Sequence, residues 1–523
     1  MGCTQCTTIR VGNVVTSTER TTSAHGGVRR GIAWSAVNNL TLRLGSLTLG
    51  IILARILSPE QFGVFAVALT LQAVLMTLAD LGLSADLIRS PDPRRLAPTI
   101  ATLGLLAGGV MTALMAGFGH TLADLMGSPA AGDVIVLLSF TLILGSAGVV
   151  PYAMLMRRFE QKKLFAIAAV NFTVSTALTL ILLAAGWGVL ALAAGRLVAQ
   201  SITLVLQFVA ARERPRFGFD RTVVRPVLAF GVPIAAANLL SWTLLNIDNI
   251  AIARLAGPVA LGFYVLAFNI SSWPMSALGQ VVRSVALPAF SRENKEGGGN
   301  GLYTATVLTW AAALPAGAFL AILSAPLIAV VYGDKWLAAA PVLAALGIFG
   351  ALRAVFDVWA AYLLARGASR PVFWIQLLWF AALVPTTIFG IIWWGIAGAA
   401  LAHVVVGMVL VLPAYGFALH RAGASVGALL RNSWPPIAAL VPAGTLAYLL
   451  TAQLASPVLA LLVGGLAGAG LYVAIMYRWV LSHIPSANPV DAVGPVDPLG
   501  PTTEETKMPT PEIHLKGTDT RNA

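Results

Sequence analysis

The stretch Leu53-Ala54-Arg55-Ile56-Leu57-Ser58-Pro59-Glu60-Gln61-Phe62-Gly63-Val64-Phe65 decides the fold, because a second version of it occurs later in the chain. There, Ala253-Arg254-Leu255-Ala256-Gly257-Pro258 is followed by Leu261-Gly262-Phe263-Tyr264, 199 positions after the matching residues. The same offset pairs Ala36 with Ala235, Asn39 with Asn238 and Ile51 with Ile250. We interpret the match as an internal repeat, the alternative being a coincidental similarity of apolar helices joined by turns.

Composition places these two copies in a membrane. Of the 523 residues, 58% are hydrophobic and only 10% are charged, whereas soluble proteins carry about 25% charged residues. Mean hydropathy is +0.84. Apolar segments of roughly 20 residues, enough to cross a bilayer as a helix, recur almost continuously and lack the alternation of membrane strands. We predict about fourteen transmembrane helices, at residues 32–54, 62–88, 97–122, 132–156, 164–186, 188–211, 227–253, 260–287, 303–331, 337–365, 371–392, 395–419, 433–453 and 456–480.

The repeat predicts the architecture of this all-α membrane protein. Six predicted helices separate the start of one copy from the start of the other, so both copies cross the membrane in the same direction. Such parallel repeats form two pseudo-symmetric lobes with the substrate site between them. The expected divisions are a polar tail at 1–30, an N-lobe at 31–211, a basic linker at 212–226, a C-lobe at 227–419, helices 13 and 14 at 420–481, and a second polar tail at 482–523.

Basic residues favour one side of this predicted topology. The formal net charge is +12, and nearly all Lys and Arg outside the helices fall in alternate connecting segments. The opposite side holds Lys335, with Arg55 and Arg254 at helix ends. The positive-inside rule then predicts a multi-pass inner-membrane protein with both termini cytoplasmic, and it explains the basic excess without a nucleic-acid partner.

Polar side chains gather in the repeat-matched helices. Polar groups inside a membrane are costly and commonly mark a transport pathway. The predicted cavity residues are Asn39, Arg43, Asp80, Asn238, Asp248, Asn249, Asn269, Gln280 and Arg283. Arg43 and Arg283 suit an anionic ligand, because guanidinium binds phosphate in a bidentate manner. The aspartates could balance these arginines or carry a coupling proton, and the alternative is that such residues only hold helices together.

Other conspicuous residues have plainer interpretations. We expect His403 to be a hydrogen-bonded buried histidine, and Trp187, Trp336, Trp393 and Trp394 to anchor helices at the membrane interface. The only cysteines, Cys3 and Cys6, lack a second pair of ligands, so no metal is expected. No phosphate-binding G-x-x-x-x-G-K-[ST] motif occurs, and no cofactor is expected. The predicted outer loops are too short for acid/base chemistry, which argues against an enzyme.

The opening stretch, followed by Asp80-Leu81-Gly82-Leu83, resembles the start of the polysaccharide transporter family of the multidrug/oligosaccharidyl-lipid/polysaccharide exporter superfamily. Asn246-Ile247-Asp248-Asn249 through Tyr264 resembles that family's second-half counterpart. The resemblance implies a MATE-like fold around a central cavity and alternating access. The implied substrate is an oligosaccharide linked to polyprenyl pyrophosphate, and a glycan polymerase and chain-length machinery are expected partners beside membrane lipids. The alternatives are a drug exporter of the same superfamily and a membrane glycan polymerase or glycosyltransferase.

Overall fold

The computed structural model describes residues 45–214, 216–296 and 301–483. Its regular secondary structure is helical throughout these ranges, which confirms the all-α prediction. Eleven helices of this part of the chain are long and apolar enough to cross a membrane. Of the predicted cavity residues, Asn39 and Arg43 lie outside the described ranges, as do the side chains of Gln280 and Arg283.

The first half begins with the described end of predicted helix 1, Gly45–Ile56. It continues with α2 (Pro59–Asp80), α3 (Leu83–Arg89), α4 (Pro93–Gly117), α5 (Gly119–Leu125), η1 (Pro129–Ala131), α6 (Gly132–Ala147), α7 (Val149–Arg157), α8 (Gln161–Ala184) and α9 (Leu190–Ala211). Ser58 starts α2 with a capping box. Its side chain accepts from the Gln61 backbone NH, and the Gln61 side chain accepts from the Ser58 backbone NH.

The second half begins with α10 (Arg221–Glu296). It continues with α11 (Gly301–Ile322), α12 (Ser324–Val331), η2 (Asp334–Ala339), α13 (Ala340–Ala365), α14 (Ser369–Val406), η3 (Gly407–Val411), α15 (Leu412–Arg421), α16 (Val426–Gln453), α17 (Pro457–Leu459), η4 (Ala460–Gly464) and α18 (Gly465–His483).

Two of these helices are interrupted at glycines. Gly257 breaks α10 with φ 82° and ψ 174°, and Gly395 breaks α14 with φ 59° and ψ −145°. Glycine alone adopts such angles readily, so the chain can reverse there without a longer loop. Each of the two long helices therefore comprises two segments, at the turns that the sequence predicted. The number of fourteen spans stays a prediction.

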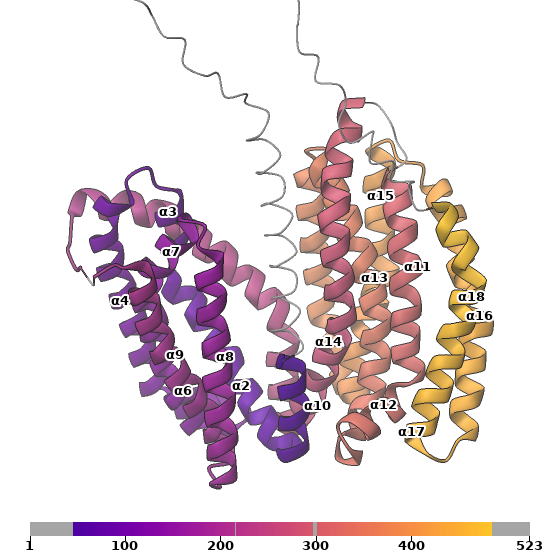
Figure 1. The fold of residues 1–523 in the computed structure, drawn as a ribbon, viewed down its shortest axis with the longest axis horizontal. Coiled ribbons are helices and arrows are strands. Elements are labelled where there is room, and N and C mark those ends of the chain that lie inside the picture. Colours follow the sequence, from indigo (N-terminus) through magenta and orange to yellow (C-terminus); the bar gives the residue numbers. More distant parts are fainter. Residues whose placement is uncertain (1–44, 215, 297–300, 484–523) are drawn as a thin grey trace, which may run out of the picture.

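The helices form two groups (Figure 1). The first-half helices α2 to α9 lie on one side, and α11 to α15 lie on the other, with α16 and α18 at its outer edge. Helix α10 runs between the groups, which approach each other at the lower end of the view. The largest buried cluster includes Ala54, Val67, Leu138, Tyr264 and Trp336, so the core contains residues from both repeats. The two-lobed fold is thereby confirmed.

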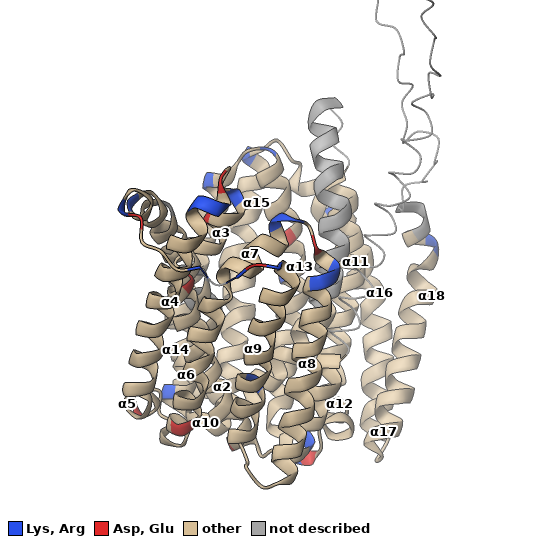
Figure 2. Ribbon diagram, turned by 60° about the vertical axis from the view of Figure 1, so that its left-hand side comes forward, with Lys and Arg blue, Asp and Glu red and all other residues tan. Residues whose placement is uncertain are grey.

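Charge differs between the two ends of the molecule. Lys and Arg are concentrated at the upper end in Figure 2, and few lie at the lower end. We call the upper end, where α3, α7 and α15 are labelled, the basic end. The described connecting segments therefore show the charge bias that the topology predicted.

Candidate functional site

The two lobes pack closely against each other at four residues, Pro59, Gly63, Pro258 and Gly262, which we call the glycine–proline clasp. A Cβ atom on Gly63 would lie 1.7 Å from the Pro258 carbonyl oxygen and 3.1 Å from the Gly262 nitrogen. A Cβ atom on Gly262 would lie 2.2 Å from the Pro59 oxygen and 3.2 Å from the Gly63 nitrogen. Only glycine therefore fits at either position while the clasp is closed.

The clasp is reciprocal, because each glycine lies on the proline of the other copy. The offset of 199 residues pairs Pro59 with Pro258 and Gly63 with Gly262. When residue i contacts residue j′ and j contacts i′, the contact surrounds a two-fold axis. The pseudo-two-fold axis of the repeat thus passes through the clasp, and the repeat is a structural one.

A second pair of contacts follows the same pseudo-symmetry. Gly127, before η1, has φ 70°, and a Cβ there would lie 2.9 Å from the Ala253 carbonyl oxygen. Gly333, before η2, has φ 99°, and a Cβ there would lie 3.2 Å from Nη1 of Arg55. Positions 253 and 254 are the repeat partners of 54 and 55. Each lobe therefore presses one loop against the helix end of the other repeat.

Hydrogen bonds fasten the second of these loops. The Arg55 guanidinium donates to the Val331 carbonyl at 2.9 Å and also to that of Val330. Lys335 Nζ donates to the carbonyls of Arg55, at 2.9 Å, and of Leu57, at 2.7 Å. Two of the three basic residues that were exceptions to the charge bias, Arg55 and Lys335, therefore join the lobes at the end opposite the basic end.

Trp336 occupies the centre of this contact. Its Nε1 donates to the Ala54 carbonyl at 2.8 Å, and its ring meets Phe62 and Phe263 edge-on, with centroids 5.5 and 5.8 Å away. The side chain is 0% exposed. The expectation that Trp336 anchors the protein at the membrane interface is wrong, because its indole NH has a buried partner and its ring fills the space between the repeats. Trp187, Trp393 and Trp394 are exposed.

A small cavity of about 140 Å³ lies among α10, α13 and α14, and Asp248 lines it. The Tyr264 hydroxyl donates to Asp248 Oδ2 at 2.7 Å, and His403 Nε2 lies 4.0 Å from the same oxygen. His403 Nδ1 lies 3.1 Å from the Ala399 carbonyl, to which it must donate, so its neutral form presents an acceptor toward the carboxylate. The buried carboxylate and imidazole therefore lie close to each other, with the Tyr264 hydroxyl as the hydrogen-bond donor to the carboxylate.

Charged and aromatic side chains complete the walls of that cavity. Its other lining residues include Arg353, Asp357, Gln376, Phe349 and Trp379. The sequence singled out Asp248 and His403 separately but did not pair them, because they are 155 positions apart and nothing in the local pattern joins them.

The remaining predicted cavity residues lie in different surroundings. Asp80 ends α2 and accepts a hydrogen bond from Ser84 at 3.1 Å. The Asn249 backbone NH donates to Asp248 Oδ1 at 2.9 Å, while Asn238 and Asn269 are exposed. Among the described residues, Asp248 is the predicted cavity residue that lines the 140 Å³ cavity. A single cavity that includes Arg43 and Arg283 stays a prediction.

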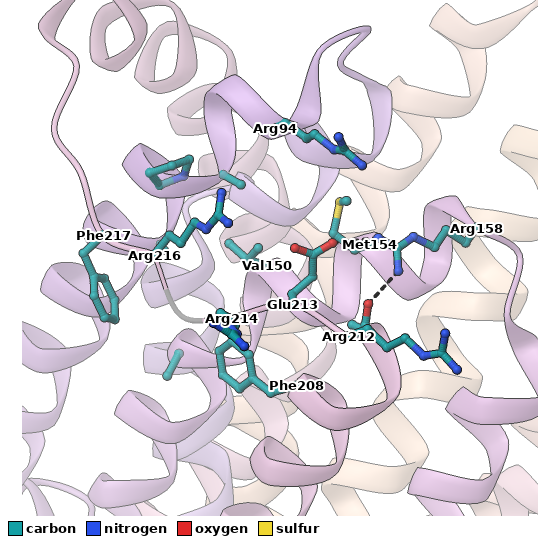
Figure 3. A pocket seen from close by; sticks show the side chains of 15 residues that line it. Arg94, Val150, Met154, Arg158, Phe208, Arg212, Glu213, Arg214, Arg216 and Phe217 are labelled. Carbon is teal, nitrogen blue, oxygen red and sulfur yellow. Dashed lines mark hydrogen bonds and ion pairs between the residues drawn. The ribbon is translucent and has the colours of Figure 1, made fainter.

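A larger cavity at the basic end was missed. It measures about 810 Å³, lies among α4, α7, α9 and the linker after α9, and is lined by Arg94, Arg158, Arg212, Arg214 and Arg216. Figure 3 shows these side chains around the cavity, with Phe208 and Val150 beside them and Glu213 as the acidic neighbour. We call it the arginine pocket. The sequence analysis used these arginines only as a topology signal, although three of them fall within five consecutive residues.

Comparisons with known proteins agree on the family and fold. The family described as "Polysaccharide biosynthesis protein" matches residues 52–341. The "Succinoglycan biosynthesis transport protein ExoT" of Rhizobium meliloti (strain 1021) is 27% identical over 458 residues, 86% of this chain and 92% of the relative. The "Lipopolysaccharide biosynthesis protein WzxC" of Escherichia coli (strain K12) is 25% identical, over 80% and 87% of the two chains.

Solved structures show the same fold. "Lipid II flippase MurJ, inward closed conformation" superposes with a TM-score of 0.70 at 15% identity, over 86% of this chain and 98% of that one. An inward-facing multidrug resistance MATE family transporter of the MOP superfamily gives a TM-score of 0.54 at 16% identity, over 76% and 99%.

Proposed function

Since the chain belongs to the family of polysaccharide biosynthesis proteins, we propose that it translocates a polyprenyl-pyrophosphate-linked oligosaccharide, a polysaccharide repeat unit, across the bacterial cytoplasmic membrane. Its relatives are named for the transport of succinoglycan and for lipopolysaccharide and teichuronic acid biosynthesis. The chain covers 92% and 87% of the lengths of the first two relatives. A glycan polymerase and its chain-length machinery are the partners that would use the exported unit.

The observation that carries the mechanism is the reciprocal clasp. If the basic end faces the cytoplasm, as the positive-inside rule requires, the clasp closes the outer end of the transporter. The two lobes, 31–211 and 227–419, would then rock about the pseudo-two-fold axis, opening the clasp to release substrate outward. Linker 212–226 connects them on the cytoplasmic side, and helices 13 and 14, at 420–481, flank the second lobe. This cycle requires no covalent chemistry on the substrate.

The polar residues of the repeat helices supply the substrate contacts in this proposal. Arg43 and Arg283 bind the pyrophosphate, because paired guanidinium groups match its oxygens in geometry and charge. The amides of Asn39, Asn238, Asn249, Asn269 and Gln280 hydrogen-bond the sugar hydroxyls. Asp80 and Asp248 either balance the arginines or carry a coupling proton, and His403 Nε2 lies 4.0 Å from the Asp248 carboxylate.

The test is export in cells that lack the chromosomal copy of the gene. Plasmids would supply wild type, Arg43→Ala, Arg283→Ala or the double variant, with Arg370→Ala as a control that removes an exposed arginine from the first turn of α14. We expect the double variant to lose surface polysaccharide and to accumulate lipid-linked oligosaccharide on the inner leaflet. Normal export by a stably inserted double variant would refute the assignment of these arginines.

The second candidate is a drug exporter of the same superfamily, which the structural similarity to a MATE transporter favours. Such a cavity favours cations and would depend on Asp80 and Asp248. Deletion of the gene would then sensitise cells to cationic drugs and leave surface polysaccharide unchanged. The lipid-linked substrate predicts the opposite pair of results.

A further inference from the structure

The arginine pocket concentrates positive charge from three parts of the chain. Arg94 comes from the first turn of α4, Arg158 follows α7, and Arg212, Arg214 and Arg216 belong to the linker. Among the residues that the structure describes, Glu213 is the one acidic residue that lines the cavity. Five guanidinium groups and one carboxylate give the lining a formal net charge of +4, which favours an anionic occupant.

Hydrogen bonds anchor the linker at its first end. Arg158 donates to the Ala211 carbonyl at 2.6 Å and to the Glu213 carboxylate at 2.6 Å, and Figure 3 marks a bond from this side chain with a dashed line. Lys163 Nζ donates to the Ala210 carbonyl at 3.1 Å. Arg212 itself adopts the left-handed conformation, with φ 54°, which is uncommon for a residue with a side chain. The end of α9 is thereby fixed over α7.

The other end of the linker is anchored on α4. The Gly218 backbone NH donates to Thr102 Oγ1 at 3.1 Å, and the Thr102 hydroxyl donates to the Gly218 carbonyl at 2.9 Å. Asp220 pairs with Arg95 at 3.9 Å. Hydrogen bonds from the Thr222 side chain and backbone lower the pKa of Asp220, which keeps the carboxylate charged for this contact. Hydrogen bonds and an ion pair therefore hold the linker at both ends, and the linker forms one wall of the pocket.

Among residues 45–214, 216–296 and 301–483, no ion pair is found for Arg94, Arg212, Arg214 or Arg216. Each of the four is exposed, so its guanidinium is accessible to a ligand. Guanidinium groups bind phosphate oxygens in a bidentate manner, and basic pockets between membrane helices suit phospholipid head groups.

The floor of the pocket is apolar, which favours a lipid over a soluble anion. Ala101, Val150 and Phe208 line it, and exposed apolar side chains continue along the same helices at Leu106 on α4 and Val205 on α9. These helices are long enough to cross the membrane. In Figure 1 the linker lies at the outer margin of the first-half helices, away from α11 to α15, so the pocket is separate from the space between the lobes.

We propose that the arginine pocket binds the head group of an anionic membrane phospholipid, with its phosphate between Arg94, Arg212 and Arg214 and its acyl chains against the apolar surface of α4 and α9. An occupied pocket ties the linker between the lobes to the membrane surface. This site differs in position and ligand from the transport pathway, so its test needs no transported substrate.

The test is lipid binding by the full-length, delipidated protein in detergent, measured by native mass spectrometry. The probes are cardiolipin, phosphatidylglycerol, phosphatidylcholine and inorganic pyrophosphate. We expect both anionic lipids to bind at least about tenfold more tightly than phosphatidylcholine. The variant Arg94→Gln/Arg212→Gln/Arg214→Gln should bind cardiolipin about 100-fold more weakly, given a roughly fivefold effect for each arginine near a lipid surface.

The matched control is Arg370→Gln/Arg431→Gln/Arg478→Gln, which removes the same charge from exposed arginines of the second half. It should retain cardiolipin affinity within about twofold. An unchanged affinity in the pocket variant, or an equal loss in the control, would overturn the proposal. Complete displacement of cardiolipin by millimolar pyrophosphate would also overturn it, since the site would then belong to a soluble anion. Unchanged elution and melting temperature verify that both variants are folded.

Discussion

Replacing Gly63 with alanine tests the clasp most directly. The new Cβ would lie 1.7 Å from the Pro258 carbonyl oxygen, whereas real Cβ atoms stay at least 3.0 Å from such neighbours. The two helices must therefore separate by about 1.3 Å, and the obstacle is backbone, which cannot rotate away. Overpacking of this kind costs about 1–3 kcal/mol.

This free-energy cost destabilises only the closed clasp, because the separated helices of the open state leave room for a methyl group. The gain in helix propensity from Gly to Ala, about 1 kcal/mol, applies to both states and does not offset the difference. The ratio of closed to open outer ends should fall by about 5- to 150-fold. Gly262→Ala should act in the same direction but less strongly, since its Cβ would meet the Pro59 oxygen at 2.2 Å.

The assay is the distance between spin labels on the outer loops of the two lobes. Asp124→Cys on α5 and Ala338→Cys on η2 are suitable sites, because both side chains are exposed. Cys3 and Cys6 would first be replaced with serine to remove background labelling. We expect wild type to populate mainly the short distance and Gly63→Ala to add a longer one.

The matched control is Gly470→Ala, also within a helix, where an added Cβ meets nothing within 4 Å. It should leave the distance distribution as in wild type. If Gly63→Ala gives the wild-type distribution in a folded, inserted protein, the two repeats do not touch at this position and the clasp is refuted.

Two further substitutions test the remaining contacts. Trp336→Phe should retain most of the ring packing but lose the hydrogen bond to Ala54, at a cost of about 1 kcal/mol, while Trp336→Ala should cost about 3–5 kcal/mol. A melting temperature unchanged in Trp336→Ala would contradict its central place between the repeats. Tyr264→Phe removes the 2.7 Å donor to the buried Asp248 and should cost about 1–3 kcal/mol, measured by thermal unfolding. Adding Asp248→Asn should recover part of that loss, and an unchanged melting temperature in Tyr264→Phe would contradict a stabilising role of this hydrogen bond.

Patterns set by the bilayer could be predicted from the sequence. The apolar segments, the glycine turn at Gly395 and the charge bias all follow from rules that act on neighbouring residues. The repeat added the relation between the lobes, because a constant offset survives in the sequence. These signals were enough for the fold class and for the family resemblance.

Contacts between distant residues could not be predicted in this way. Trp336 carries the same local signal as Trp393, an aromatic residue at a turn, yet one is 0% and the other 72% exposed. The difference arises because η2 folds against the end of the first repeat, 282 residues earlier, where the Ala54 carbonyl accepts from the indole. The arginine pocket was missed for the same reason, since Arg94 and Arg212 meet only after α4 and α9 have packed beside α7.

The clasp explains why the sequence match between the two copies of the repeat is clear around Pro59–Gly63 and Pro258–Gly262. At a pseudo-two-fold axis, the two copies of the repeat pack against each other. A side chain at position 63 must therefore fit beside Pro258, and a side chain at position 262 must fit beside Pro59. Away from the axis the copies contact different neighbours and can diverge. The loops at Gly127 and Gly333 are 206 residues apart, so the position equivalent to Trp336 is Ala130. The second-lobe loop is thus fastened by Lys335 and Trp336 to the first repeat, whereas Gly127 makes a close packing contact with Ala253. Opening the outer end therefore has to break the hydrogen bonds at the end of helix 1.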